Sequence, residues 1–365
     1  MKITRVDTIV LNLPMVFDGA TPMLGGRART SIDMLLVRVD TDAGISGWGE
    51  AFGHRIFPAT RAAIDTLLGP MCVGRDATQI QAITDDLQRA LHGVGRNGPT
   101  IYALSGIDIA LWDIAGKAAG LPLYRLIGGG RHADLPAYAS LLRYGTADAV
   151  AHYTEQALTR GYRHLKLHEI TVPEVKAARD VAGDEIAIMV DTNCPWTVPQ
   201  AVEMAKRLAP FNLTWLEEPV WPPENVAGLA EVRMRGGIPT AAGENYGTAW
   251  EFRRAFDAGA LTYAQPSVTK IGGVTELWRV MTIAETFGVQ VVPHSAYFGP
   301  GLLASIHCIA AMASEGWVER FYCDFAENPL GDAIHPGKNG RIAVPQGPGL
   351  GVDPDPRVVE ALRKS

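Results

Sequence analysis

Short apolar runs alternate with longer amphipathic stretches over most of the chain beyond residue 126. The polar positions that close these runs lie 23 to 27 residues apart, and they are Ser140, Lys166, Asp191, Glu217, Glu244, Ser267, His294 and Glu319. A strand, a crossover helix and two short loops need a segment of this length. The stretches between the runs, such as 198–208 and 276–287, carry apolar residues at helical spacing. Eight strand–helix units of nearly constant length predict a (β/α)8 TIM-like barrel over residues 126–330.

An open, doubly wound parallel sheet would show a similar alternation of strands and helices. Such sheets usually carry a glycine-rich phosphate-binding turn, and no predicted strand in this chain is followed by one. The even spacing of eight units therefore favours the closed barrel.

The first 125 residues have a different pattern, which predicts an α+β domain. Residues 1–12 alternate between polar and apolar side chains. The segments 33–39 and 46–50 flank the turn sequence Asp-Thr-Asp-Ala-Gly, which predicts a hairpin. Helical spacing follows from 59 to 126, most clearly at 103–119, where one face carries Ile107, Leu111, Ile114 and Ala115.

Three segments are predicted to be mostly irregular. Residues 13–30 and 51–57 are interrupted by Gly and Pro, and loops of this kind often bind or cover ligands. The tail, 331–365, is loop-rich with one strand-like run at 340–345, and we expect it to pack back onto the N-terminal domain.

The composition is that of a globular protein, with 47% hydrophobic and 20% charged residues. A net charge of −6 gives no indication of a nucleic-acid or anionic-membrane partner. The N-terminus lacks a signal-peptide core, and no apolar run is long enough to span a membrane. The scattered cysteines suit a reducing compartment, so we expect a cytoplasmic protein; they are Cys72, Cys194, Cys308 and Cys323.

Three acidic residues, Asp191, Glu217 and Glu244, each close an apolar run. In consecutive βα units of one parallel sheet they would lie side by side at the same strand ends. Clustered carboxylates repel one another unless a cation lies between them, and oxygen ligands suit Mg²⁺ or Mn²⁺ better than zinc or copper. Any one of them alone would be interpreted as a solvated loop acid, but the common register of all three predicts a metal site.

Basic and polar side chains flank these acids at the predicted strand ends. Lys166 and His168 are two residues apart, as are Asp191 and Asn193, so each pair can point to one side of its strand. A divalent cation beside such bases suits removal of the weakly acidic proton next to a carboxylate. The cation neutralises the enediolate, and Lys or His takes the proton.

Six segments make the chain resemble the mandelate racemase/muconate lactonizing enzyme family of the enolase superfamily. They follow the family's order over nearly the whole chain, and they are Ala103-Leu-Ser-Gly-Ile-Asp-Ile-Ala-Leu-Trp-Asp-Ile-Ala-Gly-Lys, Val190-Asp-Thr-Asn, Trp215-Leu-Glu-Glu-Pro, Gly243-Glu-Asn, Lys270-Ile-Gly-Gly-Val-Thr and Trp317-Val-Glu-Arg. This superfamily combines Lys or His bases with Mg²⁺. The resemblance implies a catalytic barrel, a capping domain at 1–125 whose loops at about 14–30 and 50–57 set specificity, and a homo-oligomer.

The resemblance also implies a role for each matching residue. The Mg²⁺ ligands, for one ion per active site, are Asp191, Glu217 and Glu244. Lys166 matches the first lysine of the family's Lys-x-Lys pair, and His294 matches the acid/base histidine after the seventh strand. Glu319 matches a glutamate that hydrogen-bonds the substrate carboxylate, and Asn193 matches a polar substrate contact. Further candidate substrate contacts in this chain are His54, Tyr297 and Ser267.

Two positions depart from the family pattern. His168 stands where the second lysine, the usual base, would be, and it can act as a base or only as a hydrogen-bonding group. Ser267 stands where relatives place an aspartate that orients the histidine, and a hydroxyl cannot stabilise an imidazolium as a carboxylate does. We expect His294 to be a weaker base, and we expect Lys270 to support structure.

The leading functional hypothesis is a Mg²⁺-dependent dehydratase that acts on a polyhydroxylated carboxylate, an acid sugar. The loss of the dyad aspartate weakens the alternative of a racemase or epimerase more than it weakens β-elimination. A sugar-lactone cycloisomerase is a further alternative. A metal-binding barrel without catalysis is disfavoured by the presence of Lys166, His294 and Glu319.

Overall fold

The N-terminal part of the protein is built on an antiparallel sheet. The computed structural model of the chain describes residues 1–17, 23–24 and 27–364. The sheet has the order β1-β4-β5, with bounds Ile3–Val16, Ser31–Thr41 and Ser46–Ala51. The predicted hairpin is confirmed, since Val39 pairs with Gly47, and Gly44 supplies the positive φ of 76° in the turn.

The two predicted loops contain some regular structure. The segment 13–30 begins inside β1 and includes a short hairpin of β2 (Met23–Leu24) and β3 (Arg27–Ala28), while 18–22 and 25–26 lie outside the described residues. The segment 51–57 contains one 3₁₀ turn, η1 (His54–Ile56).

Helices cover one face of this sheet. They are α1 (Phe57–Ala63), the π turn η2 (Ile64–Leu68), α2 (Gly69–Cys72), α3 (Ile80–Ala90), the 3₁₀ turn η3 (Leu91–Gly93), α4 (Pro99–Ala119) and α5 (Leu123–Leu126). The predicted helix α4 is buried on more than one face, because it lies between β5 and the barrel helix α11 (Gly273–Thr286). A Cβ on Gly49 would come within 1.9 Å of the Gly106 carbonyl oxygen, so glycine permits this close contact.

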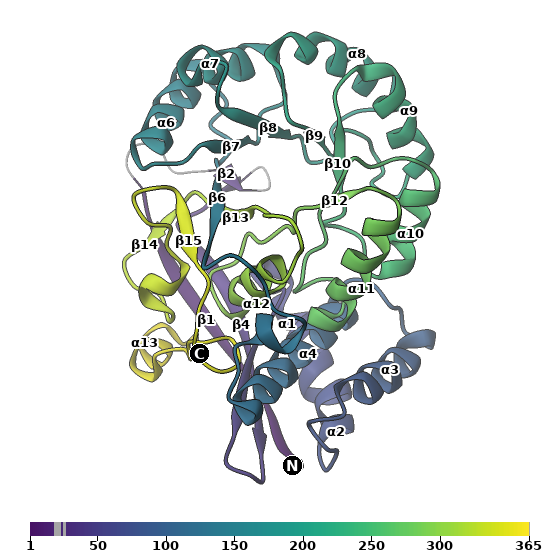
Figure 1. Ribbon diagram of the computed structural model, residues 1–365, viewed down its shortest axis with the longest axis vertical. Coiled ribbons are helices and arrows are strands. Elements are labelled where there is room, and N and C mark those ends of the chain that lie inside the picture. The colour runs from purple at the N-terminus through teal and green to yellow at the C-terminus, as the bar shows by residue number, and fades with distance from the viewer. Residues whose placement is uncertain (18–22, 25–26, 365) are drawn as a thin grey trace.

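The predicted barrel is confirmed as eight parallel strands surrounded by helices (Figure 1). The strands are β6 (Asp134–Ser140), β7 (His164–Leu167), β8 (Ala187–Asp191), β9 (Leu216–Glu217), β10 (Thr240–Ala242), β11 (Tyr263–Ala264), β12 (Gln290–Val291) and β13 (Val318–Phe321). Between them lie α6 (Ala147–Thr159), α7 (Val172–Ala182), α8 (Val198–Leu208), the 3₁₀ turn η4 (Ala209–Phe211), α9 (Val226–Gly236), α10 (Ala249–Asp257), α11 and α12 (Pro300–Ala310). None of the described helices is long and apolar enough to cross a lipid bilayer.

Residue Ser295 joins β12 to β13, two strands that have no backbone ladder between them among the described residues. Its amide donates to Glu319 Oε2 at 2.9 Å, and its hydroxyl donates to the Glu319 carbonyl oxygen at 3.0 Å. The side chain of Glu319, a predicted active-site residue, thus helps to close the barrel.

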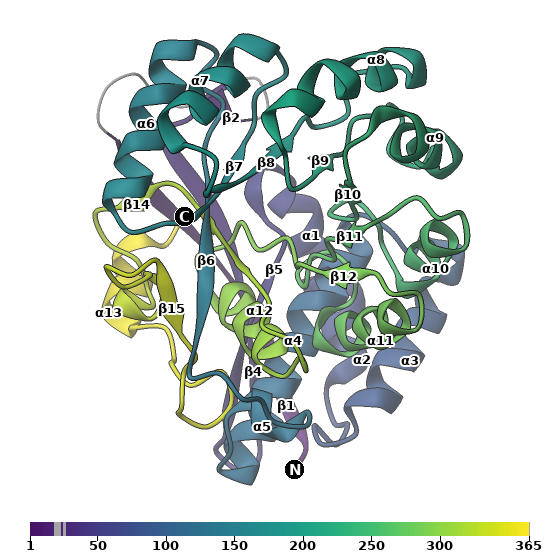
Figure 2. The same cartoon turned by 45° about the horizontal axis from the view of Figure 1, so that its top comes forward.

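The C-terminal segment contacts both parts of the fold. The strand β14 (Asp324–Phe325), which precedes this segment in the chain, pairs with β1. The predicted strand near 340 is β15 (Arg341–Ala343), which follows the turn η5 (Gly331–Ile334) and pairs with β6 of the barrel (Figure 2). Helix α13 (Pro356–Leu362) packs on β1, and the Lys364 amide donates to the Val10 carbonyl oxygen at 2.8 Å. The domain boundaries at residues 125 and 330 remain a prediction.

Replacing Glu50 with Gln should stabilise the protein at pH 8 but not near pH 4.5. Glu50 is on β5 and faces α12, where its Oε2 accepts from the Gly301 amide at 2.9 Å. Burial raises the pKa of Glu50 to about 7, so the folded state keeps a proton that the unfolded chain releases from about pH 4.5 upward. The wild type therefore loses up to about 3 kcal/mol of stability as the pH rises to 7.

Urea unfolding at several pH values measures this effect. The difference in the free energy of unfolding between Glu50→Gln and wild type should grow from pH 5 to pH 8. A difference that stays constant over this range would show that Glu50 is ionised in the folded protein at all these pH values.

Candidate active site

The strand periodicity places the site directly above an apolar layer inside the barrel. Tyr138, Met189, Trp215, Ala241 and Val292 form a buried cluster there. Side chains two residues further along a strand point to the same side. The next interior positions are thus the predicted residues Ser140, Asp191, Glu217, His294 and Glu319, all buried.

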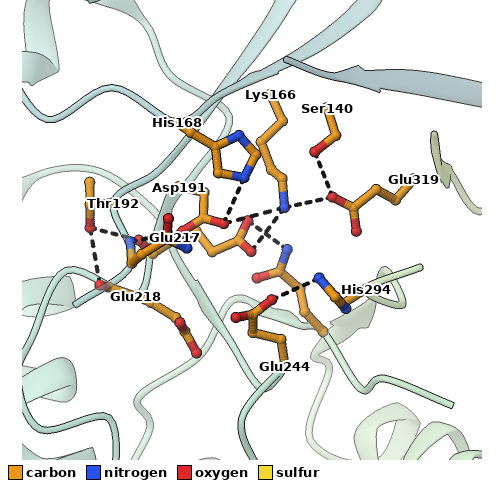
Figure 3. Close-up of polar contacts among 12 residues, drawn as sticks. Ser140, Lys166, His168, Asp191, Thr192, Glu217, Glu218, Glu244, His294 and Glu319 are labelled. Atoms are coloured by element: carbon orange, nitrogen blue, oxygen red, sulfur yellow. Dashed lines mark hydrogen bonds and ion pairs between the residues drawn. The ribbon is translucent and has the colours of Figure 1, made fainter. Parts of the chain in front are cut away.

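Lys166 is the centre of this polar layer and has no exposed surface. Its Nζ lies 2.8 Å from Glu319 Oε1, 3.1 Å from Glu217 Oε1 and 3.5 Å from Asp191 Oδ2 (Figure 3). Burial alone would lower the pKa of Lys166, but the surrounding carboxylates raise it well above its usual value. Lys166 is therefore an ammonium ion that balances part of the local negative charge.

Glu319 accepts hydrogen bonds from groups on three sides. The Ser140 hydroxyl donates to Oε1 at 2.7 Å, where Lys166 also pairs, and the Ser295 amide donates to Oε2. Burial would raise the pKa of Glu319, but Lys166 lowers it to about 2. The ionised carboxylate of Glu319 holds Lys166 in place. Glu319 would have to take up a proton before it could donate a hydrogen bond to a substrate carboxylate.

The carboxylate Glu217 is fixed inside the barrel by two N–H donors. The indole N–H of Trp215 and the side-chain amide of Gln265 donate to its Oε2 at 3.0 and 2.7 Å. Burial and the neighbouring charge of Asp191 raise the pKa of Glu217 to about 7. Asp191 and Glu217 are paired residues of β8 and β9, so their repulsion follows from the strand register.

The adjacent Glu218 points away from this cluster (Figure 3). Its backbone has a φ of 43°, and Asn245 Nδ2 donates to both of its carboxylate oxygens at 3.0 Å. Burial and the charge of Glu244 raise the pKa of Glu218 well above its usual value. Glu218 and the inward carboxylate of Glu217 thus have different hydrogen-bond partners.

Glu244 reaches the site because the chain turns at Gly243, which has a φ of 136°. A Cβ there would lie 2.5 Å from the ring of Phe252. Glu244 Oε2 lies 2.7 Å from His294 Nε2. Burial would raise the pKa of Glu244, but Lys270 and His294 hold it well below its usual range.

Two imidazoles approach the carboxylates from different sides of the barrel. His168 Nε2 lies 3.3 Å from Asp191 Oδ2, and its Nδ1 contacts the Leu141 carbonyl oxygen. Burial would lower the pKa of His168, but Asp191 raises it. His294 Nδ1 lies 3.3 Å from Ser267 Oγ and 3.4 Å from Tyr297 Oη, so two hydroxyls occupy the place of the family's aspartate.

A cavity of about 730 Å³ opens above these groups, between the barrel and the N-terminal part of the chain. The predicted residues that line it are His54, His168, Asn193, Glu244 and His294. Lys166, Asp191, Glu217 and Glu319 are buried next to these lining residues, and Ser267 and Tyr297 contact the wall through His294.

Three side chains at this site were not predicted to be functional. Gln265 lies two residues before Ser267. Side chains two residues apart on a strand point to the same side, and this spacing could have indicated that Gln265 faces the site. Arg143 lines the cavity and donates from Nε to the His168 carbonyl oxygen; its place in a loop gave no signal. Lys270, expected to support structure, also lines the cavity.

Comparison with known proteins identifies the family. A model described as "Enolase C-terminal domain-like" matches residues 149–358, more than half of the chain. A second, "Mandelate racemase / muconate lactonizing enzyme, N-terminal domain", matches residues 21–128. The chain belongs to the mandelate racemase/muconate lactonizing enzyme family of the enolase superfamily. The implied family and fold are therefore confirmed, and this family member is an enzyme.

Three relatives show how much of the chain this similarity covers. D-galactarolactone cycloisomerase of Agrobacterium fabrum is 33% identical, over 97% of this chain and 96% of its own. Arabinonate dehydratase of Saccharolobus solfataricus is 30% identical, over 89% of each chain. The crystal structure of an enolase superfamily member from Polaromonas sp. JS666 is 34% identical, covers 100% of this chain and 98% of its own, and has a TM-score of 0.89.

Members of this superfamily use Mg²⁺, and a similar structure, a racemase from Streptomyces coelicolor A3(2), contains bound magnesium (29% identical, TM-score 0.87, covering 99% of this chain and all of its own). The residues of this enzyme fit the ion, since three carboxylates, those of Asp191, Glu217 and Glu244, meet at adjacent strand ends. In the described part of the chain, however, no three His, Cys, Asp or Glu side chains are arranged as a ligand group. Each carboxylate instead faces a cation or donor of the protein, such as Lys166 or His294.

Proposed function

We propose that this enzyme removes the proton α to the carboxylate of an acid sugar and expels the oxygen on the β-carbon, a dehydration. The observation that carries the proposal is that His168 and His294 line one cavity from β7 and β12, with carboxylates beside both rings. An acid and a base on different sides of a bound substrate suit β-elimination.

We propose that Asp191, Glu217 and Glu244 hold one Mg²⁺, which Mn²⁺ can replace. When bound, the ion would supply positive charge beside the reacting carboxylate and stabilise the negative charge that develops there. Lys166 adds a fixed ammonium charge on the same side, and Glu319 keeps it there.

The contacts of the two rings support an assignment of acid and base. His168 is held by the Leu141 carbonyl oxygen at Nδ1, so its Nε2 is the atom that can take a proton. His294 contacts hydroxyls at Nδ1 and Glu244 Oε2 at Nε2, and we assign the proton on Nε2 to the departing hydroxyl. Asn193, which lines the cavity beside Asp191, would orient the substrate.

A second candidate is cycloisomerisation, in which the β-oxygen belongs to a ring and no water is lost. It is favoured by the similarity to D-galactarolactone cycloisomerase over 97% of this chain. Both reactions begin with removal of the same α-proton, so the proposed roles of the two histidines apply to both.

Incubation with Mg²⁺ in D₂O with a panel of aldonic, aldaric and uronic acids and their lactones tests the proposal. Loss of water with formation of a keto acid supports the dehydratase, and ring opening without loss of water supports the cycloisomerase. Deuterium at the α-carbon without elimination would replace the proposal with a racemase or epimerase. No exchange and no product with any acid would overturn it and favour a metal-binding barrel without catalysis.

Replacing His168 or His294 with Asn should lower kcat by about 10²- to 10⁴-fold, the usual contribution of one acid or base. His168→Asn should also abolish α-proton exchange, whereas His294→Asn should keep exchange and lose elimination. His152→Asn on the exposed face of α6 is the matched control and should keep wild-type kcat. Exchange that survives in His168→Asn would show that another group is the base.

We further propose that the enzyme is a cytoplasmic homo-oligomer. The cytoplasmic location is supported by the four cysteines, none of which forms a disulfide. Light scattering coupled to size-exclusion chromatography measures the oligomeric state, and elution as a monomer would contradict that part of the proposal.

A further inference from the structure

The cavity above the catalytic groups has a strongly cationic lining in a protein with a net charge of −6. Its lining includes five Lys and Arg side chains, which are Arg29, Arg55, Arg143, Lys270 and Lys364, and two carboxylates, Asp33 and Glu244. Both carboxylates are engaged, Asp33 with Lys364 at 3.2 Å and Glu244 with His294 at 2.7 Å. The lining therefore carries positive charge in excess.

Lys270 is the most informative of these cations, because it is only 6% exposed. No carboxylate of the described residues lies within 4 Å of its Nζ, which sits 4.5 Å from the ring centroid of Phe52. The attraction of a ring face for an ammonium ion is much weaker than the cost of removing that ion from water. Lys270 is thus a nearly buried charge with no ion pair within 4 Å among the described residues, and its electrostatic partners, first of all Glu244, lie farther away.

Three neighbours make this region a distinct part of the cavity, which we call the cationic corner and define as Lys270, Phe52, His54 and Arg55. His54 stacks on Phe52 with ring centroids 4.8 Å apart, and all four residues line the cavity. Arg55 is exposed and forms no ion pair with any described residue. Burial and the charge of Lys270 lower the pKa of His54 to about 4, so a neutral imidazole completes the corner.

The cationic corner is separate from the groups that would hold the reacting carboxylate. Those groups surround Lys166, whose ion pairs are with Asp191, Glu217 and Glu319. The carboxylates that act on Lys270 over longer range are Glu244 and Glu218, and Glu218 is held by Asn245. A substrate with one carboxylate would leave Lys270 with these longer-range partners alone.

We propose that the cationic corner binds a second carboxylate at the far end of the substrate, so that the enzyme acts on aldaric acids, free or as monolactones, in preference to aldonic acids. This inference rests on the proposed function and names its substrate class. The ammonium of Lys270 and the guanidinium of Arg55 bind the second carboxylate, and His54 donates a hydrogen bond to it.

The test compares matched hexaric and hexonic acids of every configuration, in kcat/KM with Mg²⁺ and in calorimetric binding. We expect kcat/KM for the best hexaric acid or its lactone to exceed that for its hexonic counterpart by at least about tenfold, the effect of one charge-assisted contact. Because Lys270 also acts on Glu244, the readout is the diacid-to-monoacid ratio of kcat/KM, which Lys270→Met should lower by about 10- to 100-fold.

A second variant and a control distinguish a loss of diacid binding from a general structural defect. Arg55→Met changes an exposed residue and should reduce the same diacid-to-monoacid ratio. Lys176→Met removes an exposed charge on α7 that pairs with Asp180, and it should leave the ratio unchanged. A structural defect would lower both rates together and leave their ratio unaltered, which would contradict the proposal.

The outcomes separate this inference from the proposed function. Turnover of aldonic acids or of 6-phosphogluconate in preference to hexaric acids would overturn the inference and leave the proposed function standing. A diacid preference that survives in both variants would also overturn it. Tight, Lys270-dependent binding of a diacid without turnover would support the cationic corner and overturn the proposed function, and failure to bind or convert any acid would overturn both.

Discussion

Replacing Lys166 with Met should lower the free energy of unfolding by about 3–5 kcal/mol in the presence of EDTA, the usual effect of removing one partner from a buried ion pair. Lys166 is fully buried and contacts Asp191, Glu217 and Glu319 within 3.5 Å. Met has a similar volume but leaves these carboxylates without their central cation. Turnover should also be lost.

Urea unfolding with EDTA and with Mg²⁺ measures this prediction. Mg²⁺ should recover part of the lost stability, because a ligand that binds the folded state stabilises it. Lys176→Met is the matched control, since its exposed pair with Asp180 should contribute about 0–1 kcal/mol. A Lys166→Met protein as stable as wild type in EDTA would show that the carboxylates are not charged in the folded state.

The architecture was predictable because each barrel unit repeats one hydrophobic pattern. The ends of the apolar runs at Asp191 and Glu217 coincide with the ends of β8 and β9. The short strands β14 and β15 were not predicted at their observed pairings, because two or three residues carry no periodicity and their partners are set by the course of the tail. Helix α4 was predicted, but its burial on several faces depends on where the barrel lies.

The candidate site was predictable where strand periodicity places a side chain, and less so where a loop does. Ser140, Asp191 and Glu319 follow interior positions of their strands, so register alone puts them in one layer. Arg143 and Lys270 lie in loops, and only the folded chain shows that both face the cavity. The contact of Glu244 with His294 likewise depends on the turn at Gly243.

The ion pairs within the site could not be predicted at all. From charge alone, Lys166 could pair with any of several carboxylates. Its observed pairs depend on the direction of each side chain inside the barrel. The same holds for the two hydroxyls beside His294, because Tyr297 lies in the loop after β12.

Replacing Glu217 with Gln should weaken Mg²⁺ binding by more than about 100-fold, whereas Glu218→Gln should have almost no effect. The two residues are neighbours in sequence and both are buried, but their side chains point in different directions (Figure 3). Glu217 is next to Asp191 in the strand register and contacts Lys166. Glu218 is held by Asn245 outside the cluster, so the change to an amide there should not remove a metal ligand.

Titration of Mg²⁺ into wild type, Glu217→Gln and Glu218→Gln by isothermal calorimetry at pH 8 is the most direct test of the proposed metal centre. We predict one Mg²⁺ per chain for wild type and Glu218→Gln, with similar affinities, and no measurable binding at millimolar concentration for Glu217→Gln. Unchanged binding by Glu217→Gln, or loss of binding by Glu218→Gln alone, would contradict the assignment of Asp191, Glu217 and Glu244 as the metal ligands.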